Sequence, residues 1–178
     1  MKHLEETRID GEQILDGRLL KVFRDHVRLP DGREATREYV KHPGACMVIA
    51  ELRPGVLILE RQYRYPVGRV CLEMPAGKLD PDESPLRCAQ RELQEETGYS
   101  ATGWRHVGTL HPCIGYSDEH IEIFLAQGLS LGERKLDDGE FLDVLEMSLE
   151  EAEAAVLDGR ISDGKTIAGL FWARKLLV

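Results

Sequence analysis

GKLDPDESPLRCAQRELQEETGY, residues 77–99, is the stretch of this 178-residue chain that says most about its fold. It predicts a strand end, a loop and then a helix. Ser84 and Pro85 are typical of a helix start, because a serine hydroxyl can cap the first turn and proline at the first helical position loses no hydrogen bond. Gly98 predicts the end of the helix, since glycine adopts a left-handed backbone without strain.

The predicted helix has one apolar side and one acidic side. The apolar residues that recur at helical spacing, and that we expect to pack inward, are Leu86, Ala89 and Leu93. The acidic residues are Glu92, Glu95 and Glu96, whose spacing of three and four places all three on one side of the helix. Such a side could be an ordinary solvated charged surface, which is the usual interpretation of a glutamate pair taken alone.

The crowding of these carboxylates indicates a metal site instead. Each pair of like charges at helical spacing costs roughly 0.2–0.5 kcal/mol even in water. A divalent cation removes that repulsion, and carboxylate oxygens are the ligands that Mg²⁺ and Mn²⁺ prefer. Arg91, four residues before Glu95, could hold that carboxylate in place, and Glu83 in the preceding loop could anchor Arg91.

Composition predicts a single globular domain, with room for a small appendage. Hydrophobic residues make up 42% of the chain and charged residues 31%. The formal net charge of −9 argues against nucleic acid or an anionic membrane as a partner. No apolar run is long enough to span a membrane, and the N-terminus lacks the apolar segment of a signal peptide. The four widely spaced cysteines suggest reduced thiols in a cytoplasmic protein and make a zinc site improbable.

The rest of the chain reads mainly as strands. Residues 18–41 predict a hairpin with a turn at residues 30–32. Further strands are expected in the segments ACMVIAEL, GVLILERQYR, VCLEMPAG, TGWRHVGTLHP, EHIEIFLAQGL and FLDVLEMS. A helix capped by Ser148 should run to about Leu157, and TIAGLFWARKLL should form the last helix. This order predicts an α/β/α layered domain with a mixed central sheet, preceded by an N-terminal β-hairpin region.

The acidic helix also resembles a known signature. Its spacing, G-x5-E-x7-R-E-U-x-E-E-x-G-U with U a bulky apolar residue, resembles the Nudix box of enzymes that hydrolyse a nucleoside diphosphate linked to another group. The matching positions are Gly77, Glu83, Arg91, Glu92, Glu95, Glu96 and Gly98. Segments outside the box resemble the branch of ADP-ribose pyrophosphatases and related nucleotide-sugar hydrolases: HPGA, RQYRYPVG, LEMPAGKLD, GYSDE, DDGEF and KTIAGL, between residues 42 and 170.

Two positions depart from the usual patterns. The chain has Pro112-Cys113-Ile114-Gly115 where that branch usually has Ser-Pro-Gly. Tyr99 replaces the aliphatic residue that ends the general box, although an aromatic ending resembles this branch. These departures concern the identity of the substrate more than the chemistry.

The resemblance implies a Nudix α/β/α sandwich and a homodimer. Residues 1–41 would form an N-terminal β region that exchanges strands with the partner subunit, and residues 42–178 would form the catalytic domain. The metal ligands implied are Glu92, Glu95, Glu96 and the main-chain carbonyl of Ala76. The catalytic base implied is Glu140, with Asp137 and Asp138 as alternatives.

The resemblance also implies residues that bind the substrate. Arg64 matches an arginine that contacts the diphosphate or the terminal ribose, and a guanidinium suits phosphate oxygens. Glu73 would lie near the mouth of the site, although a strand-end ion pair explains it equally well. Arg37 could reach substrate from the hairpin, even in the neighbouring subunit, although an ordinary hairpin surface is the simpler interpretation.

The implied reaction is Mg²⁺-dependent hydrolysis of ADP-ribose to AMP and ribose 5-phosphate, with Mn²⁺ as a substitute metal. The nearest alternative is the same chemistry on another nucleotide sugar such as GDP-mannose. A noncatalytic Nudix-like ligand sensor is a second alternative, which the complete set of box carboxylates disfavours. The removal of mutagenic nucleotides is a third, which the segments outside the box disfavour.

Overall fold

The computed structural model describes residues 2–177 and divides into two compact units. One unit comprises Met1–Pro43 and Cys113–His120, and the other comprises Gly44–Pro112 and Ile121–Val178.

The first unit is built on a three-stranded antiparallel sheet. Its strands are β1 (Thr7–Asp16), β2 (Lys21–Arg28) and β3 (Glu34–Lys41), in the order β1-β2-β3, preceded by a 3₁₀ turn at Lys2–Leu4. The predicted hairpin is therefore confirmed as β2 and β3. Strand β1 was not expected, because every residue in it is exposed and it offers no alternation of buried and exposed positions to detect.

The second unit contains a seven-stranded mixed sheet. Its strands are β4 (Ala45–Arg53), β5 (Val56–Arg64), β6 (Arg69–Glu73), β7 (Ala76–Lys78), β8 (Tyr99–Leu110), β9 (Ile121–Leu131) and β10 (Leu142–Ser148). The main order is β10-β5-β4-β9-β8, with β6 beside β5 and β7 beside β4. Strands β4 and β9 are parallel, and the other pairs are antiparallel. The segment expected as one strand, VCLEMPAG, forms β6 and β7 separately.

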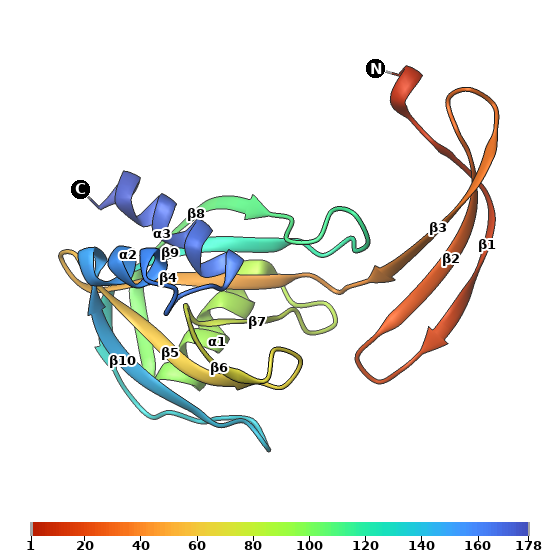
Figure 1. Ribbon diagram of the computed structural model, residues 1–178. Helices are drawn as coiled ribbons and strands as arrows, with labels where there is room; N and C mark the ends of the chain where they lie inside the picture. The colour runs from red at the N-terminus through yellow and green to blue at the C-terminus, as the bar shows by residue number, and fades with distance from the viewer. Residues whose placement is uncertain (1, 178) are drawn as a thin grey trace. The chain divides into compact units, whose positions relative to one another are not determined.

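Three helices cover the two faces of this sheet (Figure 1). They are α1 (Pro85–Thr97), α2 (Leu149–Leu157) and α3 (Gly164–Leu176). On one face Met47, Ile49, Leu57 and Leu59 pack with buried residues of α2 and α3. On the other face Cys46, Val48 and Ile58 pack with Cys88, Ala89 and Leu93 of α1. Alternate residues of β4 and β5 thus serve opposite cores, which produces the expected α/β/α layers.

The ends of α1 follow the sequence signals with two corrections. Gly98 adopts φ 78° and its backbone N–H donates to the carbonyl of Gln94, so it ends the helix as expected. Ser84 occupies the N-cap position, but its side chain makes no capping hydrogen bond, which corrects that expectation. Leu86 is 39% exposed, unlike Ala89 and Leu93, because it belongs to the first turn and the buried side continues through Cys88 instead.

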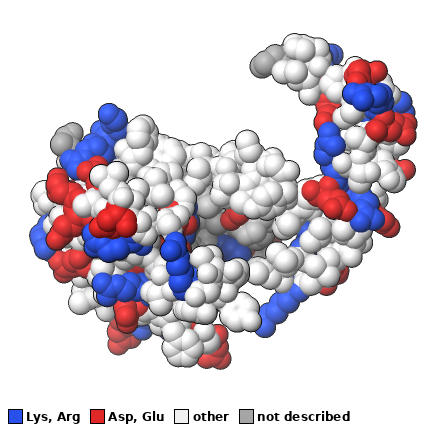
Figure 2. Space-filling model, viewed as in Figure 1, with Lys and Arg blue, Asp and Glu red and all other residues white. Residues whose placement is uncertain are grey.

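The visible surface carries charges of both signs. Lysine and arginine side chains are interspersed with aspartate and glutamate on the face shown in Figure 2. Ion pairs on the surface of the molecule include Arg160 with Asp158 and Arg53 with Glu146. Among residues 2–177, none of the helices has both the length and the apolar character needed to cross a membrane.

Candidate active site

Strand β7 and helix α1 approach each other closely at Gly77. A Cβ atom at this position would lie 1.8 Å from Oε1 and 1.9 Å from Cδ of Glu92. Only glycine therefore leaves room for the Glu92 carboxylate against the strand. This contact explains why a glycine is needed fifteen residues before the first acidic residue of the helix, and it places Glu92 between α1 and the sheet.

Glu96 lies one turn further along α1 and is held by the same strand. Glu96 is 4% exposed, and its Oε2 accepts a hydrogen bond of 3.0 Å from the backbone N–H of Ala76. The structure therefore brings together Ala76, Glu92 and Glu96. Glu95 is less buried, with 33% of its side chain exposed. The three carboxylates follow one side of α1 but differ in their access to solvent.

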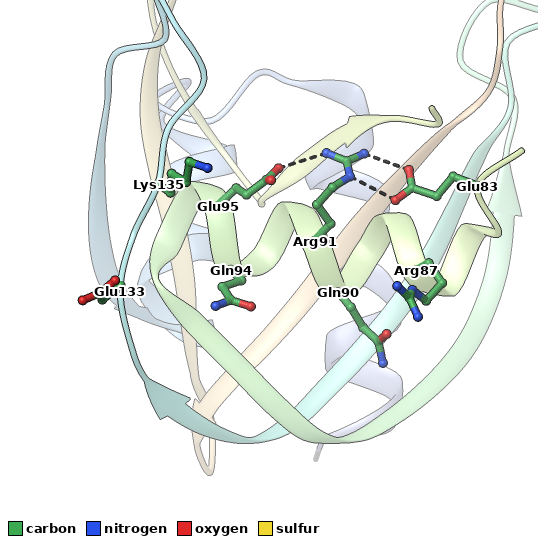
Figure 3. Close-up of a pocket in the computed structure, with 8 residues that line it drawn as sticks. All are labelled: Glu83, Arg87, Gln90, Arg91, Gln94, Glu95, Glu133 and Lys135. Atoms are coloured by element: carbon green, nitrogen blue, oxygen red, sulfur yellow. Dashed lines mark hydrogen bonds and ion pairs between the residues drawn. The ribbon is translucent and has the colours of Figure 1, made fainter. Parts of the chain in front are cut away.

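Arg91 joins the acidic side of α1 to the preceding loop (Figure 3). Its Nε and NH2 atoms donate to the two carboxylate oxygens of Glu83 at 3.0 and 2.8 Å, while NH1 donates to Glu92 at 2.9 Å and Glu95 at 3.0 Å. The expected roles of Arg91 and Glu83 as a structural link are confirmed. The hydrogen bonds from Arg91 lower the pKa of Glu83 to about 2.

An open pocket of about 450 Å³ runs along the solvent side of α1. Helix residues line most of it, and the remainder is lined by Glu83 from the loop before α1 and by Glu133 and Lys135 from the loop before β10 (Figure 3). The backbone N–H of Lys135 donates to the carbonyl of Glu95 at 3.2 Å, which ties this loop to the helix. Glu95 and Arg91 are therefore reachable from solvent on one side, whereas Glu96 faces the sheet.

Glu60 on β5 is a buried acidic residue that the sequence analysis did not single out. It is 3% exposed, and its Oε1 has no hydrogen-bond partner. Alternation along the strand puts it on the same face as Ile58, which packs against α1. The sequence did contain a signal for this residue. In the strand GVLILERQYR, Glu60 follows Ile58 by two positions and therefore continues the set of side chains that face the core.

Burial and neighbouring negative charges raise the pKa values of three carboxyl groups. Burial raises the pKa of Glu92 to about 7 despite Arg91. Burial, followed by the charge of Glu140, raises the pKa of Glu60 to about 8. Burial, followed by the charges of Glu60, Glu92 and Glu140, raises the pKa of Glu96 to about 10. The carboxylates of α1, β5 and the loop before β10 thus form one electrostatic cluster with an excess of negative charge.

Glu140 enters this cluster from the loop before β10. Gln62 on β5 donates to its Oε1 at 3.1 Å, and Glu140 is partly buried while Asp137 and Asp138 are exposed. The charge of Glu140 raises the pKa values of Glu60, Glu92 and Glu96, whereas no such influence of Asp137 or Asp138 accompanies those pKa shifts. Among the three acidic residues that the sequence analysis weighed, Glu140 is the one that the fold brings to the buried carboxylates.

The side chains of Arg64, the last residue of β5, and Glu73, the last residue of β6, form an ion pair. Arg64 donates from Nε and NH2 to the two oxygens of Glu73 at 2.7 and 2.9 Å. Lys165, at the start of α3, also binds Glu73 and donates to Asp163 at 2.9 Å. Burial by itself would raise the pKa of Glu73, but Arg64 and Lys165 outweigh it and the pKa is lowered. The sequence alone gave no individual signal for Lys165, which belongs to the segment KTIAGL.

Arg37 lies in the other compact unit. It sits on β3, and its Nε donates to Oε2 of Glu6 at 2.9 Å. The structure therefore gives Arg37 a local ion-pair partner, Glu6, which directly precedes β1 in the same compact unit.

The carboxylate cluster has the donor chemistry that a divalent metal requires. It offers oxygen ligands, it carries more negative charge than its arginines neutralise, and it includes a buried oxygen of Glu60 that lacks a partner. As the side chains stand, residues 2–177 contain no group of three or more His, Cys, Asp or Glu placed to share a metal ion. Arg91 binds Glu92 and Glu95, and the Ala76 N–H binds Glu96, so a cation would have to share these carboxylates with their present hydrogen-bond donors.

Comparison with known proteins gives the family. The family model of the NUDIX domain matches residues 40–170. The chain belongs to the Nudix family. A second family model, described as the nucleoside diphosphate sugar hydrolase N-terminal domain, matches residues 6–40. The expectation of a Nudix hydrolase of nucleoside diphosphate sugars is thus confirmed at the level of the family, whose members generally use a divalent metal.

Individual relatives of this Nudix protein carry several names. It is 42% identical to an ADP-ribose pyrophosphatase of Bacillus subtilis (strain 168), over 93% of this chain and 91% of the relative. It is 38% identical to an ADP-ribose pyrophosphatase of Mycobacterium tuberculosis (strain ATCC 25618 / H37Rv), over 95% of this chain and 83% of the relative. A GDP-mannose pyrophosphatase of Yersinia enterocolitica serotype O:8 / biotype 1B (strain NCTC 13174 / 8081) is 34% identical, over 76% of this chain and 75% of the relative.

A solved structure confirms the fold. The crystal structure of an ADP compounds hydrolase superposes with a TM-score of 0.86, at 24% sequence identity, covering 97% of this chain and 94% of the other. The expected Nudix α/β/α sandwich with a mixed central sheet is therefore confirmed.

Proposed function

We propose that this Nudix protein hydrolyses ADP-ribose to AMP and ribose 5-phosphate, with Mg²⁺ as its metal and Mn²⁺ as a working substitute. The observation that carries the proposal is the cluster of the buried Glu96 with the partly buried Glu92 and Glu140, in which burial and like charges raise the pKa values of Glu92 and Glu96. A divalent cation bound by Glu92 and Glu96 would offset that negative charge. The choice of ADP-ribose is supported by two relatives of that name, which match nearly the whole chain.

The box residues would hold the metal. Glu92, Glu95 and Glu96 supply carboxylate oxygens, and the main-chain carbonyl of Ala76 supplies a neutral oxygen. When bound, a divalent cation offsets the charge of the diphosphate and makes a bound water more acidic. Arg91 keeps Glu92 and Glu95 oriented from the side, because its guanidinium is itself fixed by Glu83.

The remaining residues would bind the substrate and move a proton. Arg64, whose orientation is set by Glu73, presents a guanidinium suited to phosphate oxygens. Glu140 accepts a proton from the attacking water as the water oxygen bonds to phosphorus. The bond between that phosphorus and the bridging oxygen breaks, and the bridging oxygen leaves with the other phosphate. Gln62 holds Glu140 toward the cluster.

Replacement of the proposed base should slow the reaction and spare the metal. We expect Glu140→Gln to lower kcat by about 10²- to 10⁴-fold, the usual contribution of a positioned base. Mn²⁺ affinity, measured by calorimetry, should stay near that of the wild type. The matched control is Asp138→Asn, an exposed acid in the same loop, which should retain its activity. Full activity of Glu140→Gln would show that another group takes the proton.

A substrate panel tests the function itself. The purified protein with Mg²⁺ would be incubated with ADP-ribose, GDP-mannose, NADH, diadenosine polyphosphates and deoxynucleoside triphosphates, and the products separated by chromatography. The proposal predicts the highest kcat/KM for ADP-ribose, with AMP and ribose 5-phosphate as products. A higher kcat/KM for GDP-mannose would favour the second candidate, which rests on the more distant relative of that name.

We also infer that the two parts of the chain have different functions. Residues 42–178 would carry catalysis, and residues 1–41 would form the β region that exchanges with a partner in a homodimer. Strand β1 supports this inference, because Ile9, Ile14 and Leu15 are 43%, 40% and 47% exposed and leave apolar surface to be covered. Arg37 would then serve as a substrate-binding residue delivered from this sheet. A cytoplasmic location belongs to the same proposal and is supported by the four free cysteines.

The dimer predicts a simple mass. Light scattering of the purified protein should give the mass of two 20.1 kDa chains. If the apolar side chains of β1 hold the two chains together, Ile9→Asp should weaken the dimer and shift the measured mass toward that of one chain. A wild-type mass of one chain at micromolar concentration would contradict the exchange of strands.

A further inference from the structure

We propose that Glu60 is a further carboxylate ligand of the divalent-metal centre, contributed by the sheet rather than by the box helix. The inference rests on the proposed metal-dependent function and adds a residue that lies outside the box. It begins from an unexplained feature of the fold, which is a buried acidic side chain inside the sheet without a partner for one of its oxygens.

The position of Glu60 in the strand directs it at the cluster. Ile58, two residues earlier, packs with Leu93 and Cys88 of α1. Since successive side chains of a strand alternate between its faces, Glu60 emerges on the same face, toward α1. Gln62, two residues later, binds Glu140. Glu60 therefore lies between the residue that packs on the metal-binding helix and the residue that holds the proposed base.

The cations near Glu60 have other partners. Arg64 gives two hydrogen bonds to Glu73, and NH2 of Arg134 donates to the carbonyl of Leu142 at 2.6 Å. The other charged groups near Glu60 are carboxylates, those of Glu140, Glu73 and Glu96. Protein side chains thus leave its Oε1 without a hydrogen bond, in surroundings where an unpartnered carboxylate is costly. A divalent cation shared with Glu96 would supply the missing partner.

A purely structural interpretation makes a different prediction. If Glu60 were only a buried neutral acid, an amide of the same shape would replace it without loss. If Glu60 is a ligand, the amide should relieve repulsion in the metal-free protein and weaken metal binding at the same time. Opposite effects on these two measurements distinguish a ligand from a packing residue.

The experiment compares Mn²⁺ binding and thermal stability in four proteins without substrate. They are the wild type, Glu60→Gln, Glu96→Gln and the control Glu146→Gln, whose residue lies on β10 and pairs with Arg53. Calorimetry gives the Mn²⁺ affinity and stoichiometry, and melting in EDTA gives the metal-free stability. We expect Glu60→Gln to melt no lower than the wild type in EDTA and to bind Mn²⁺ at least about tenfold more weakly or with one ion fewer.

The outcomes separate this inference from the function on which it rests. Wild-type Mn²⁺ binding by Glu60→Gln, together with a loss in Glu96→Gln, would overturn the role of Glu60 and leave the proposed centre intact. Wild-type binding by both variants would overturn the centre itself. If Glu60→Gln does not fold, Glu60→Asp takes its place, because it keeps the charge and withdraws the oxygens by one methylene. Unchanged Mn²⁺ affinity in Glu60→Asp would then overturn the inference.

Discussion

Glu96→Gln should reduce the turnover of ADP-ribose by about 10³-fold or more while the protein stays folded, which corresponds to roughly 4 kcal/mol of lost transition-state stabilisation. The amide keeps the size of the side chain and can still accept the hydrogen bond from the Ala76 N–H. It removes one of the charged ligands that we assign to the metal. Steady-state kinetics in Mg²⁺ and circular dichroism measure the two effects.

The same variant should be more stable than the wild type when metal is removed. Burial and neighbouring carboxylates raise the pKa of Glu96 to about 10, so the unfolded chain ionises before the folded one. A group whose pKa is raised in the folded state contributes fully to the free energy of unfolding at a pH below its ordinary pKa. That contribution is lost as the pH rises toward the pKa of the folded state. In EDTA the melting temperature of the wild type should therefore fall between pH 5 and pH 9, and that of Glu96→Gln should fall less.

Two results would contradict this account of Glu96. Turnover near the wild-type rate would show that the metal does not depend on this carboxylate. An equal decline in stability with pH for both proteins would show that Glu96 is not under electrostatic strain. Glu146→Gln serves as the control in both assays, because its carboxylate is 48% exposed and lies on the surface of β10.

Gly77→Ala should have the second large effect. The added methyl group would lie 1.8 Å from Oε1 of Glu92, so either the carboxylate or strand β7 must move. Overpacking of this kind costs about 1–3 kcal/mol of stability. A displacement of about 1 Å in a catalytic group costs about 10²-fold in rate, and we expect at least that loss in kcat/KM.

Gly103→Ala is the matched control for this prediction. It lies in β8 of the same sheet, and a Cβ atom there would meet its nearest neighbour, the carbonyl oxygen of Gln127, at an ordinary 3.6 Å. Gly103→Ala should keep its activity and its melting temperature. If Gly77→Ala were as active as Gly103→Ala, the position of Glu92 against β7 would not matter for the reaction.

Local spacing was enough to predict the acidic helix. Its end at Gly98, its buried residues Ala89 and Leu93, and the link from Arg91 to Glu83 all depend on residues within two dozen positions of one another. The layered fold also followed from the order of the segments, because each apolar strand or amphipathic helix must bury one face. The first-turn errors at Ser84 and Leu86 show that exact contacts at a helix end depend on what packs beside it.

Partners that are distant in sequence could not be predicted in the same way. Glu60 reaches the acidic cluster only because β5 runs beside the helix with a particular face turned inward. Lys165 reaches Glu73 because the first turn of α3, although distant in sequence, lies beside the last residue of β6. Strand β1 had no alternation of buried and exposed residues, since each of its residues is exposed, and its pairing with β2 defines it.

The amino-acid sequence alone therefore sufficed for the family, the acidic helix and the class of reaction, since all three depend on short-range spacing of charged and small residues. Folding added the surroundings of those residues. Burial turned ordinary glutamates into carboxyl groups with raised pKa values, and it selected Glu140 over Asp137 and Asp138. The reason is physical: desolvation and long-range charge depend on which side chains meet in space, and strand register and helix packing determine those meetings.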